Sequence, residues 1–400
     1  MTEQEKDLLR QVQEDHAYIV ELRRHFHMHP ELGREEYETQ KRIEAELDAI
    51  GVAHHRAADT GVVAEITGTG SSELPAKTVL LRADIDALPV TEESGCPYQS
   101  TIPGKMHACG HDTHTAALIG AARLLAKNRN LFHGTVRLVW QPAEEIGYGG
   151  QTMVAEGVAD GADRTFGIHI GSDIPVGKVV IMEGPNNASV DWFRIKVHGL
   201  GAHVSTPQHG IDAAYIASQI VIGAQALVTR RTSPMDNVLI GIGKVTAGTA
   251  YNVVAQEAEL EGTVRVLSPE LRKQVHEELD RLCRLTAEAY GGTVETEWKN
   301  YTAPLLNDAK SAQEAQKVMI SLFGAENMII SRKPALSGDD MAEFINKVPG
   351  VYCYVGSRNE TDPNTQVAQH NSHFDVDENC MLIQVALYTD YAVRFLEGQV

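Results

Sequence analysis

The chain has few basic residues for its number of acidic ones. Its 400 residues include 35 Lys and Arg against 54 Asp and Glu, which gives a formal net charge of -19. Nucleic acids and anionic membrane surfaces repel a polyanion, so we expect neither among the partners of this protein. The same balance favours solubility and, weakly, the binding of cations.

Long apolar runs are also missing. The longest, Ile216–Val228, is interrupted by Ser218, Gln219 and Gln225 and falls short of the roughly 20 residues that a membrane span needs. The charged start is not followed by an apolar segment, so we expect no signal peptide. The five cysteines are odd in number and scattered, which fits a reducing compartment rather than a disulfide framework. We therefore expect a cytoplasmic protein.

The length and an apolar content of 43% predict two domains, each with its own core. Strand patterns alternate with helix patterns in both end segments of the chain, as expected for an α/β/α sandwich around a mostly parallel sheet. The predicted strands are 61–66, 78–84, 135–140, 165–170, 178–182 and 350–357, and the predicted helices are 3–28, 35–50, 115–125, a helix from 312 and 379–396.

The middle of the chain follows a different pattern. Its predicted order is strand, helix, two strands, helix and strand, over 192–198, 210–230, 238–246, 251–266, 268–290 and 293–298. This order matches a split βαβ, ferredoxin-like motif with antiparallel character. We therefore predict an inserted α+β domain over 188–299, with a discontinuous first domain made of 1–187 and 300–400.

A segment rich in Cys and His stands out at 106–116. Cys109 and His111 are transition-metal ligand types two residues apart, on a loop that leads into a predicted helix. Such a loop could wrap one ion or share a ligand between two ions. A buried Cys beside surface His residues is the plainer interpretation. A Cys–His nucleophile pair is a third, although residues two apart seldom meet in that way.

Other chemically active side chains follow predicted strands of the same sheet. Glu144 and Glu145 come after one such strand and before a glycine-rich turn, and His169 ends the next strand. Ligands bind at this edge of parallel α/β sheets, where one carboxylate could hold a metal and the other act as a general base. Paired carboxylates are usually solvated, and a lone His at a strand end is usually structural.

Further candidates lie before and after these strands. Asp84 and Asp86 close the strand that precedes the Cys/His loop and could orient imidazoles that bind a metal. His370 and His373 lie near the C-terminus. Each signal is weak alone, but together they place several metal-ligand types at one edge of one sheet.

Five stretches of the sequence resemble a known family. They are Arg23–Gly33, Arg82–Pro89, His107–Ala116, Gln141–Glu145 and His370–Asp375. Together they are similar to the motifs of the two-metal aminoacylase and carboxypeptidase family. The most similar branch contains hippurate hydrolases, auxin-conjugate hydrolases and N-acetyl-diaminopimelate deacetylases, in which a Cys replaces a carboxylate ligand.

The resemblance implies a set of site residues. The metal ligands would be Cys109, His111, Glu145, His169 and His370, with Cys109 between two divalent ions in each subunit. Manganese or zinc would fill the site, and cobalt or nickel could also fit. Glu144 would be the general base and acid, and Asp86 would support the ligands. His107 and His114 receive no role.

The inserted domain resembles the family's lid and dimerisation domain, so we expect a homodimer or a higher homo-oligomer. By resemblance, His203 stabilises the oxyanion, often across the dimer, and Asn252 and Arg265 hold the substrate carboxylate, with Gly338 in a loop that lines the same pocket. The sequence departs from the family pattern near Ala202, Gln208 and Asp339. These positions concern the lid and the pocket rather than the metal ligands.

The implied activity is hydrolysis of an N-acyl-amino acid to a carboxylic acid and a free amino acid. Acetyl, benzoyl and larger aryl-acyl groups are the expected acyl parts. Two alternatives stay open. One is a dipeptidase or carboxypeptidase that uses the same metals, and the other is a metal-bound protein that has lost the chemistry. The intact Glu144–Glu145 pair argues against the second alternative.

Overall fold

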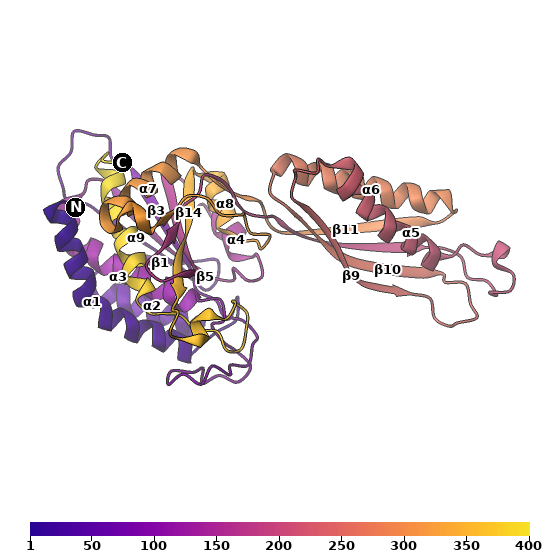
Figure 1. Ribbon diagram of the computed structural model, residues 1–400, viewed down its shortest axis with the longest axis horizontal. Helices are drawn as coiled ribbons and strands as arrows, with labels where there is room; N and C mark the ends of the chain where they lie inside the picture. Colours follow the sequence, from indigo (N-terminus) through magenta and orange to yellow (C-terminus); the bar gives the residue numbers. More distant parts are fainter. The chain divides into compact units, whose positions relative to one another are not determined.

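A computed structural model describes residues 1–400, which form two compact units (Figure 1). The large unit contains Met1–Asn186, Leu306–Lys333 and Asp340–Val400. The small unit contains Asn187–Leu305 and Pro334–Asp339. Each unit has its own apolar core. The small unit is longer than the predicted 188–299 because its last strand continues to Thr302 and because 334–339 returns to it.

The large unit is built on an eight-stranded sheet in the order β1-β2-β4-β3-β5-β14-β6-β13. The four central strands, β4, β3, β5 and β14, are parallel to one another, while β1 and β2 add antiparallel neighbours. The strands are β1 (His54–Ala57), β2 (Gly61–Thr67), β3 (Thr78–Asp84), β4 (Thr135–Gln141), β5 (Arg164–Pro175), β6 (Val179–Val180), β13 (Met328–Ile329) and β14 (Gly350–Arg358). The predicted α/β fold with a largely parallel central sheet is confirmed.

Helices cover both faces of this sheet. In Figure 1, α1, α3 and α9 lie on one side of the strands and pack against one another, and α4 and α8 form a second pair on the other side. The helices are α1 (Glu3–Met28), α2 (Tyr37–Ala49), α3 (His111–Lys127), α4 (Gly149–Ala155), α7 (Ala309–Phe323), α8 (Met341–Lys347) and α9 (Cys380–Leu396). None of them, nor any helix of the small unit, is long and apolar enough to cross a membrane.

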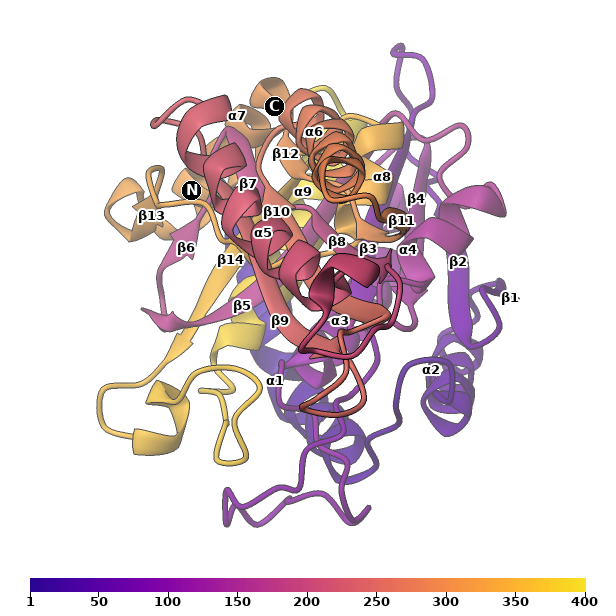
Figure 2. The ribbon, with the colours of Figure 1, turned by 90° about the vertical axis from the view of Figure 1, so that its right-hand side faces the viewer.

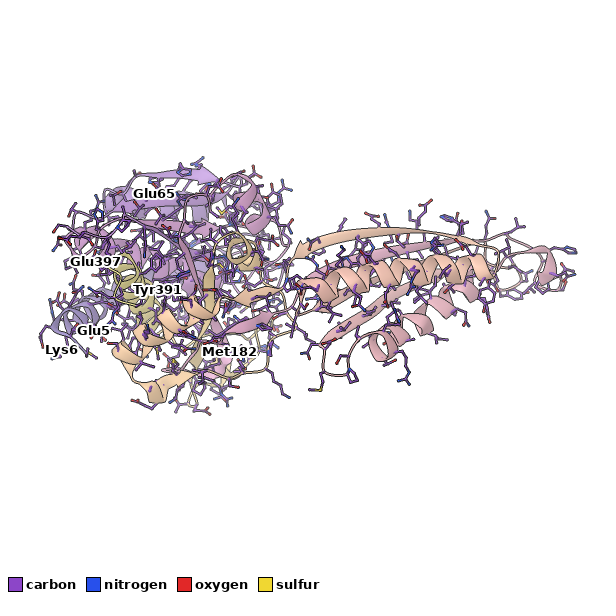
Figure 3. All side chains as sticks on the ribbon, turned by 90° about the horizontal axis from the view of Figure 1, so that it is seen from above. Glu5, Lys6, Glu65, Met182, Tyr391 and Glu397 are labelled. Atoms are coloured by element: carbon purple, nitrogen blue, oxygen red, sulfur yellow. The ribbon has the colours of Figure 1, made fainter.

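Aromatic packing fixes β5, the strand that carries His169. Phe166 is fully buried, and its ring stacks on Tyr391 of α9 with a centroid distance of 4.4 Å. The rings of Phe166 and Tyr388 form a T-shaped pair with a centroid distance of 5.7 Å. Figure 3 labels Tyr391 inside the large unit. Aromatic pairs of this kind contribute beyond their buried area, so the position of β5 relative to α9 is well determined.

The small unit has the element order that the sequence predicts. Its antiparallel sheet runs β11-β8-β10-β9, and α5 and α6 lie side by side (Figure 2). The elements are β8 (Val190–His198), α5 (Ala213–Ala226), β9 (Val238–Ala247), β10 (Glu257–Val266), α6 (Pro269–Ala289) and β11 (Thr293–Thr302). Burial along β8 alternates at every residue, as expected for a sheet covered on one face.

Two predicted boundaries are wrong in ways that concern function. The strand predicted over 251–266 begins only at Glu257, so Asn252 lies in an exposed turn. The helix predicted from 115 begins at His111. Gly110 supplies its N-cap with a φ of 96°, a left-handed conformation that suits glycine. His111 is therefore the first residue of a helix rather than part of a loop.

Candidate active site

Six predicted site residues gather at one edge of the large unit. They are Asp86, Cys109, His111, Glu145, His169 and His370, with Glu144 beside them in the chain. The charge of Glu144 acts on Cys109, but its carboxylate lies within 4.8 Å of that of Asp340. Asp86 follows β3, the two glutamates follow β4, and His111 opens α3, so most come from segments at the carboxyl ends of parallel strands. This is the edge where α/β sheets bind ligands.

Cys109, His111 and Glu145 form the centre of this group, with ligand atoms all within 4.8 Å of one another. Gly110 separates Cys109 from His111, and glycine is favoured there because a Cβ would lie 2.3 Å from Ile170 Cδ1. Two buried atoms of the group, His111 Nε2 and Glu145 Oε1, make no hydrogen bond. Buried polar atoms normally have a partner, and a lone pair without one is suited to a cation.

Asp86 orients both of these residues. The Nδ1–H of His111 lies 2.9 Å from the carbonyl oxygen of Asp86 and 3.2 Å from Asp86 Oδ1. Asp86 Oδ2 accepts the backbone N–H of Glu145 at 3.0 Å. Burial lowers the pKa of His111, but the nearby carboxylates outweigh it and raise that pKa to about 10. The site therefore attracts positive charge at this imidazole.

His169 is held as a neutral imidazole. Its Nδ1–H donates to the carbonyl oxygen of Ile170 at 2.7 Å, which leaves Nε2 facing Cys109 Sγ at 3.5 Å. Burial, together with the nearby His114 and His111, holds its pKa well below the usual range. Gln369 donates to the same carbonyl at 3.2 Å. His169 thus presents a lone pair, the form in which histidine binds metals.

His370 reaches the group from a tight turn. Its φ is 66°, and its N–H donates to the carbonyl oxygen of Ala108 at 2.7 Å, directly beside Cys109. Its Nε2 lies 3.4 Å from Glu145 Oε1. Interaction with Glu145 raises the pKa of His370, while burial opposes the shift. The left-handed backbone at a non-glycine residue is a strain typical of functional sites.

The Cys109 thiol needs a cation to ionise. Burial raises its pKa well above the usual range, and the charges of Glu145, Glu144 and Asp84 raise it further. Bound divalent metals deprotonate cysteine outright and reverse this electrostatic effect. A thiol, imidazoles and a carboxylate form a donor set that suits zinc and its neighbours. The residues present fit a transition-metal centre.

A second group, made of Asp84, His111, His114 and His169, also brings ligand atoms together. The ligand atoms of Asp84 and His114 are already occupied. Asp84 Oδ1 lies 2.5 Å from His114 Nδ1, and Asp84 Oδ2 accepts from Arg82 at 2.6 Å. His114 Nε2 accepts the N–H of Ile170 at 3.0 Å. His114 therefore connects α3 to β5. The sequence alone did not predict this role, because His114 lies in the stretch His107–Ala116 together with the proposed metal ligands.

The first of the five stretches that resemble the family, Arg23–Gly33, also has a structural role. Buried Arg23 on α1 donates to Asp112 at 2.7 Å and to Asp375 at 2.8 Å. His27 lies between two carboxylates, 2.8 Å from Asp112 Oδ2 and 3.1 Å from Glu92 Oε1. Asp112 is the neighbour of His111, so this network fixes the start of α3.

Glu144 lies in a turn that begins with Ala143, whose backbone is left-handed. Ala143 has a φ of 53°, and its carbonyl oxygen accepts the N–H of Tyr148 at 3.1 Å. Gly149 is required there, since a Cβ would lie 1.7 Å from the carbonyl oxygen of Pro142. Glu36, another residue that the sequence analysis missed, is buried beside this turn and accepts the N–H of Ala143.

Four predicted residues belong to the small unit. The N–H of Val204, next to His203, donates to the carbonyl oxygen of Asn252 at 3.2 Å, so these two candidates are neighbours. His203 Nδ1 accepts the N–H of Ser205, which places the imidazole proton on Nε2.

The other two candidates of the small unit also lie near each other in the fold. Arg265 Nη1 donates to the carbonyl oxygen of Leu336 at 3.3 Å, two residues before Gly338. A Cβ at Gly338 would lie 2.3 Å from Val190 Cγ2, so only glycine fits there.

Comparison with known proteins identifies the family of this chain. The model of the peptidase family M20/M25/M40 matches residues 80–394. This chain belongs to that family. The M20 chain is 37% identical to the N-acetylcysteine deacetylase of Bacillus subtilis (strain 168), over 96% of its own length and 98% of that protein. The predicted family and the predicted class of enzyme, a hydrolase of amide bonds, are therefore confirmed.

Two further relatives bear on metal and substrate. Thermostable carboxypeptidase 2 of Saccharolobus solfataricus is 36% identical, with 96% of this M20 chain and 97% of the relative covered. The solved structure of the Bacillus subtilis YXEP protein, described as a dinuclear metal-binding peptidase from the M20 family, has a TM-score of 0.83 and 34% identity. It covers 96% of this chain, and 99% of that structure is covered in turn.

His111 and His114 differ in a way that metal analysis can detect. We expect His111→Ala to lower the metal content from about two ions to one or fewer per chain, because it removes a buried nitrogen that makes no hydrogen bond within the protein. His114→Ala should keep the metal but cost about 2 kcal/mol of stability, because it leaves Asp84 Oδ1 and the Ile170 N–H without their hydrogen bonds to His114. Plasma mass spectrometry and urea denaturation measure the two effects, with exposed His55→Ala as the control. Loss of metal only from His114→Ala would contradict the assignment.

Glu36 gives a prediction for the pH dependence of stability. Burial and the charge of Asp86 raise the pKa of Glu36 from 4.5 to about 7. The folded state then holds this proton more tightly than the unfolded state, so Glu36 destabilises the fold as pH rises from about 4.5 to 7. In metal-free protein, Glu36→Gln should gain about 3 kcal/mol relative to wild type between pH 4 and pH 8. A stability difference that does not change with pH would contradict the shift.

Proposed function

We propose that this protein hydrolyses the amide bond of N-acyl-amino acids with two divalent metal ions per subunit. The observation that carries the proposal is the pair of buried atoms that make no hydrogen bond, His111 Nε2 and Glu145 Oε1, beside the Cys109 thiol. The proposed ligands are Cys109, His111, Glu145, His169 and His370. Manganese or zinc is the proposed metal, and cobalt or nickel also suits these donors.

Glu144 is the proposed general base and acid. Divalent ions at such a site lower the pKa of water and polarise the amide carbonyl. Glu144 precedes the ligand Glu145 in the same turn, so it can take a proton from the attacking water and pass it to the leaving amine. Asp86 keeps His111 and Glu145 in position during this transfer.

The small unit is the proposed lid and dimerisation domain. His203 carries its proton on Nε2, which suits donation to an oxyanion. Arg265 donates hydrogen bonds within the unit from Nε and from Nη1, but none from Nη2. Nη2 is therefore available to bind the carboxylate of an amino acid. Asn252 and the Gly338 loop would complete that subsite.

A homodimer and a cytoplasmic location are also part of the proposal. Strand β9 lies at the edge of its sheet, with Leu239 and Val245 exposed, and would provide a pairing surface for a homodimer. All five cysteines are unpaired, which agrees with a reducing, cytoplasmic location.

The substrate preference separates the main proposal from its rival. N-acetylcysteine deacetylase and the thermostable carboxypeptidase are similar to this chain to nearly the same degree. An N-acyl-amino acid hydrolase binds a neutral acyl group, whereas a dipeptidase binds a free α-amino group.

A substrate panel tests the proposed activity. We expect metal-reconstituted protein to cleave acetyl-, benzoyl- and aryl-acyl-amino acids faster than the matching dipeptides. Glu144→Gln should lower kcat by about 100-fold to 10,000-fold and keep the metal, because it removes proton transfer only. Exposed Glu65→Gln is the matched control. Retained turnover in Glu144→Gln would refute the base assignment, and a preference for dipeptides would favour the rival.

Arg265 gives a separate test of substrate recognition. Arg265→Ala should raise KM for N-acyl-amino acids by about 10-fold or more, since a charge-assisted hydrogen bond contributes about 1.5–3 kcal/mol. The same substitution should change KM little for substrates whose carboxylate is converted to an amide. An equal effect on both substrates would show that Arg265 does not contact the carboxylate.

A further inference from the structure

The segment from Gly33 to Glu36 lies against the turn that carries the two glutamates. A Cβ added to Gly33 would lie 3.1 Å from Ala143 Cα and 3.3 Å from Asp86 Oδ2. The preceding residues are tied to the end of β3, because the N–H of Ala87 donates to the carbonyl oxygen of Glu31 at 2.8 Å. This segment therefore touches both the base-bearing turn and the carboxylate that orients His111.

Glu36 makes the decisive contact. Its Oε1 accepts the backbone N–H of Ala143 at 2.8 Å, and its Oε2 accepts the hydroxyl of Thr60 at 2.6 Å. Glu36 and Thr60 are both fully buried. The carboxyl thus bridges the start of β2 and the turn after β4, two segments far apart in the sequence.

The turn depends on such a contact because its backbone is strained. Ala143 has a φ of 53°, a left-handed conformation that a residue with a Cβ adopts at a cost of roughly 1 kcal/mol or more. Strained conformations persist where surrounding contacts fix them. The N–H of Ala143 points to Glu36, and its carbonyl oxygen points to Tyr148.

The position is costly for a carboxyl group. No basic side chain forms an ion pair or hydrogen bond with Glu36, and burial with the charge of Asp86 disfavours its ionised form. An amide could accept the same N–H without this cost. Destabilising polar groups of this kind gather at functional sites.

We propose that Glu36 is a positioning residue for Glu144 and Glu145. By holding the N–H of Ala143, it fixes the left-handed turn from which both carboxylates extend. The proposal rests on the proposed roles of Glu144 as base and Glu145 as ligand. It assigns a role to Glu36, which follows the family-like stretch Arg23–Gly33.

Three substitutions at Glu36 test the role. Glu36→Gln keeps an acceptor for the Ala143 N–H, so kcat should stay within about 3-fold of wild type. Glu36→Ala removes the acceptor, and Glu36→Asp is one methylene too short to reach it. Both should lower kcat by about 10-fold to 100-fold at saturating metal with KM little changed, as expected for misplaced reacting groups.

Hydrogen exchange of residues 143–150 supplies a readout that does not depend on activity. Exchange should be faster in Glu36→Ala and Glu36→Asp than in wild type or Glu36→Gln, in metal-free and metal-loaded protein alike. If Glu36→Ala does not fold, Glu36→Asp carries the test. Unchanged kcat and exchange in Glu36→Asp would overturn the proposal, and so would a loss in Glu36→Gln equal to that in Glu36→Asp.

The outcomes separate this proposal from the proposed function. If Glu144→Gln stays active, the base assignment fails. Faster hydrogen exchange of residues 143–150 in Glu36→Ala and Glu36→Asp would still show that Glu36 holds the turn, and unchanged exchange would show that it does not. If Glu144→Gln is inactive and the Glu36 variants keep wild-type kcat and exchange, only the positioning role fails.

Discussion

The carboxylate of Asp86 joins the two halves of the candidate site. One half contains His111, the first residue of α3. The other half contains Glu145, in the turn that follows β4. Asp86 receives hydrogen bonds from both, through the imidazole Nδ1–H and through the backbone N–H of Glu145. This arrangement fixes which imidazole nitrogen faces the centre, and that nitrogen makes no hydrogen bond. A histidine–carboxylate pair of this form is typical of residues that bind metals.

The electrostatics around that centre are unbalanced without a cation. Asp86, Glu144 and Glu145 bring negative charge to a largely buried region. Burial and nearby carboxylates raise the pKa of the Cys109 thiol well above its usual range. Burying uncompensated charge costs several kcal/mol per group, so a divalent ion would stabilise the fold as well as supply chemistry. Although burial lowers the pKa of His111, the charges of Asp84, Asp86 and Glu145 raise it to about 10. Metal binding and folding are expected to be coupled in this protein.

The sequence predicted the elements that carry the site better than it predicted the contacts between them. The bounds of β3 and the start of β4 follow directly from apolar runs, and the strand ends placed the candidate residues at one edge of the sheet. Local pattern could not reveal that His114 accepts from Ile170, or that Glu36 accepts from Ala143, because those contacts join segments far apart in the chain. The turn at 251–256 was predicted as strand because its apolar residues resemble the strand that follows.

The central claim is that Cys109, His111, Glu145, His169 and His370 hold two metal ions. Anomalous diffraction from crystals of protein reconstituted with manganese or zinc, recorded at the absorption edge of the metal, tests this most directly. The account predicts two anomalous peaks, both within bonding distance of Cys109 Sγ, with one or both in contact with His111 Nε2. A single peak, or peaks bound by Asp84 and His114 in place of Cys109 and Glu145, would contradict it.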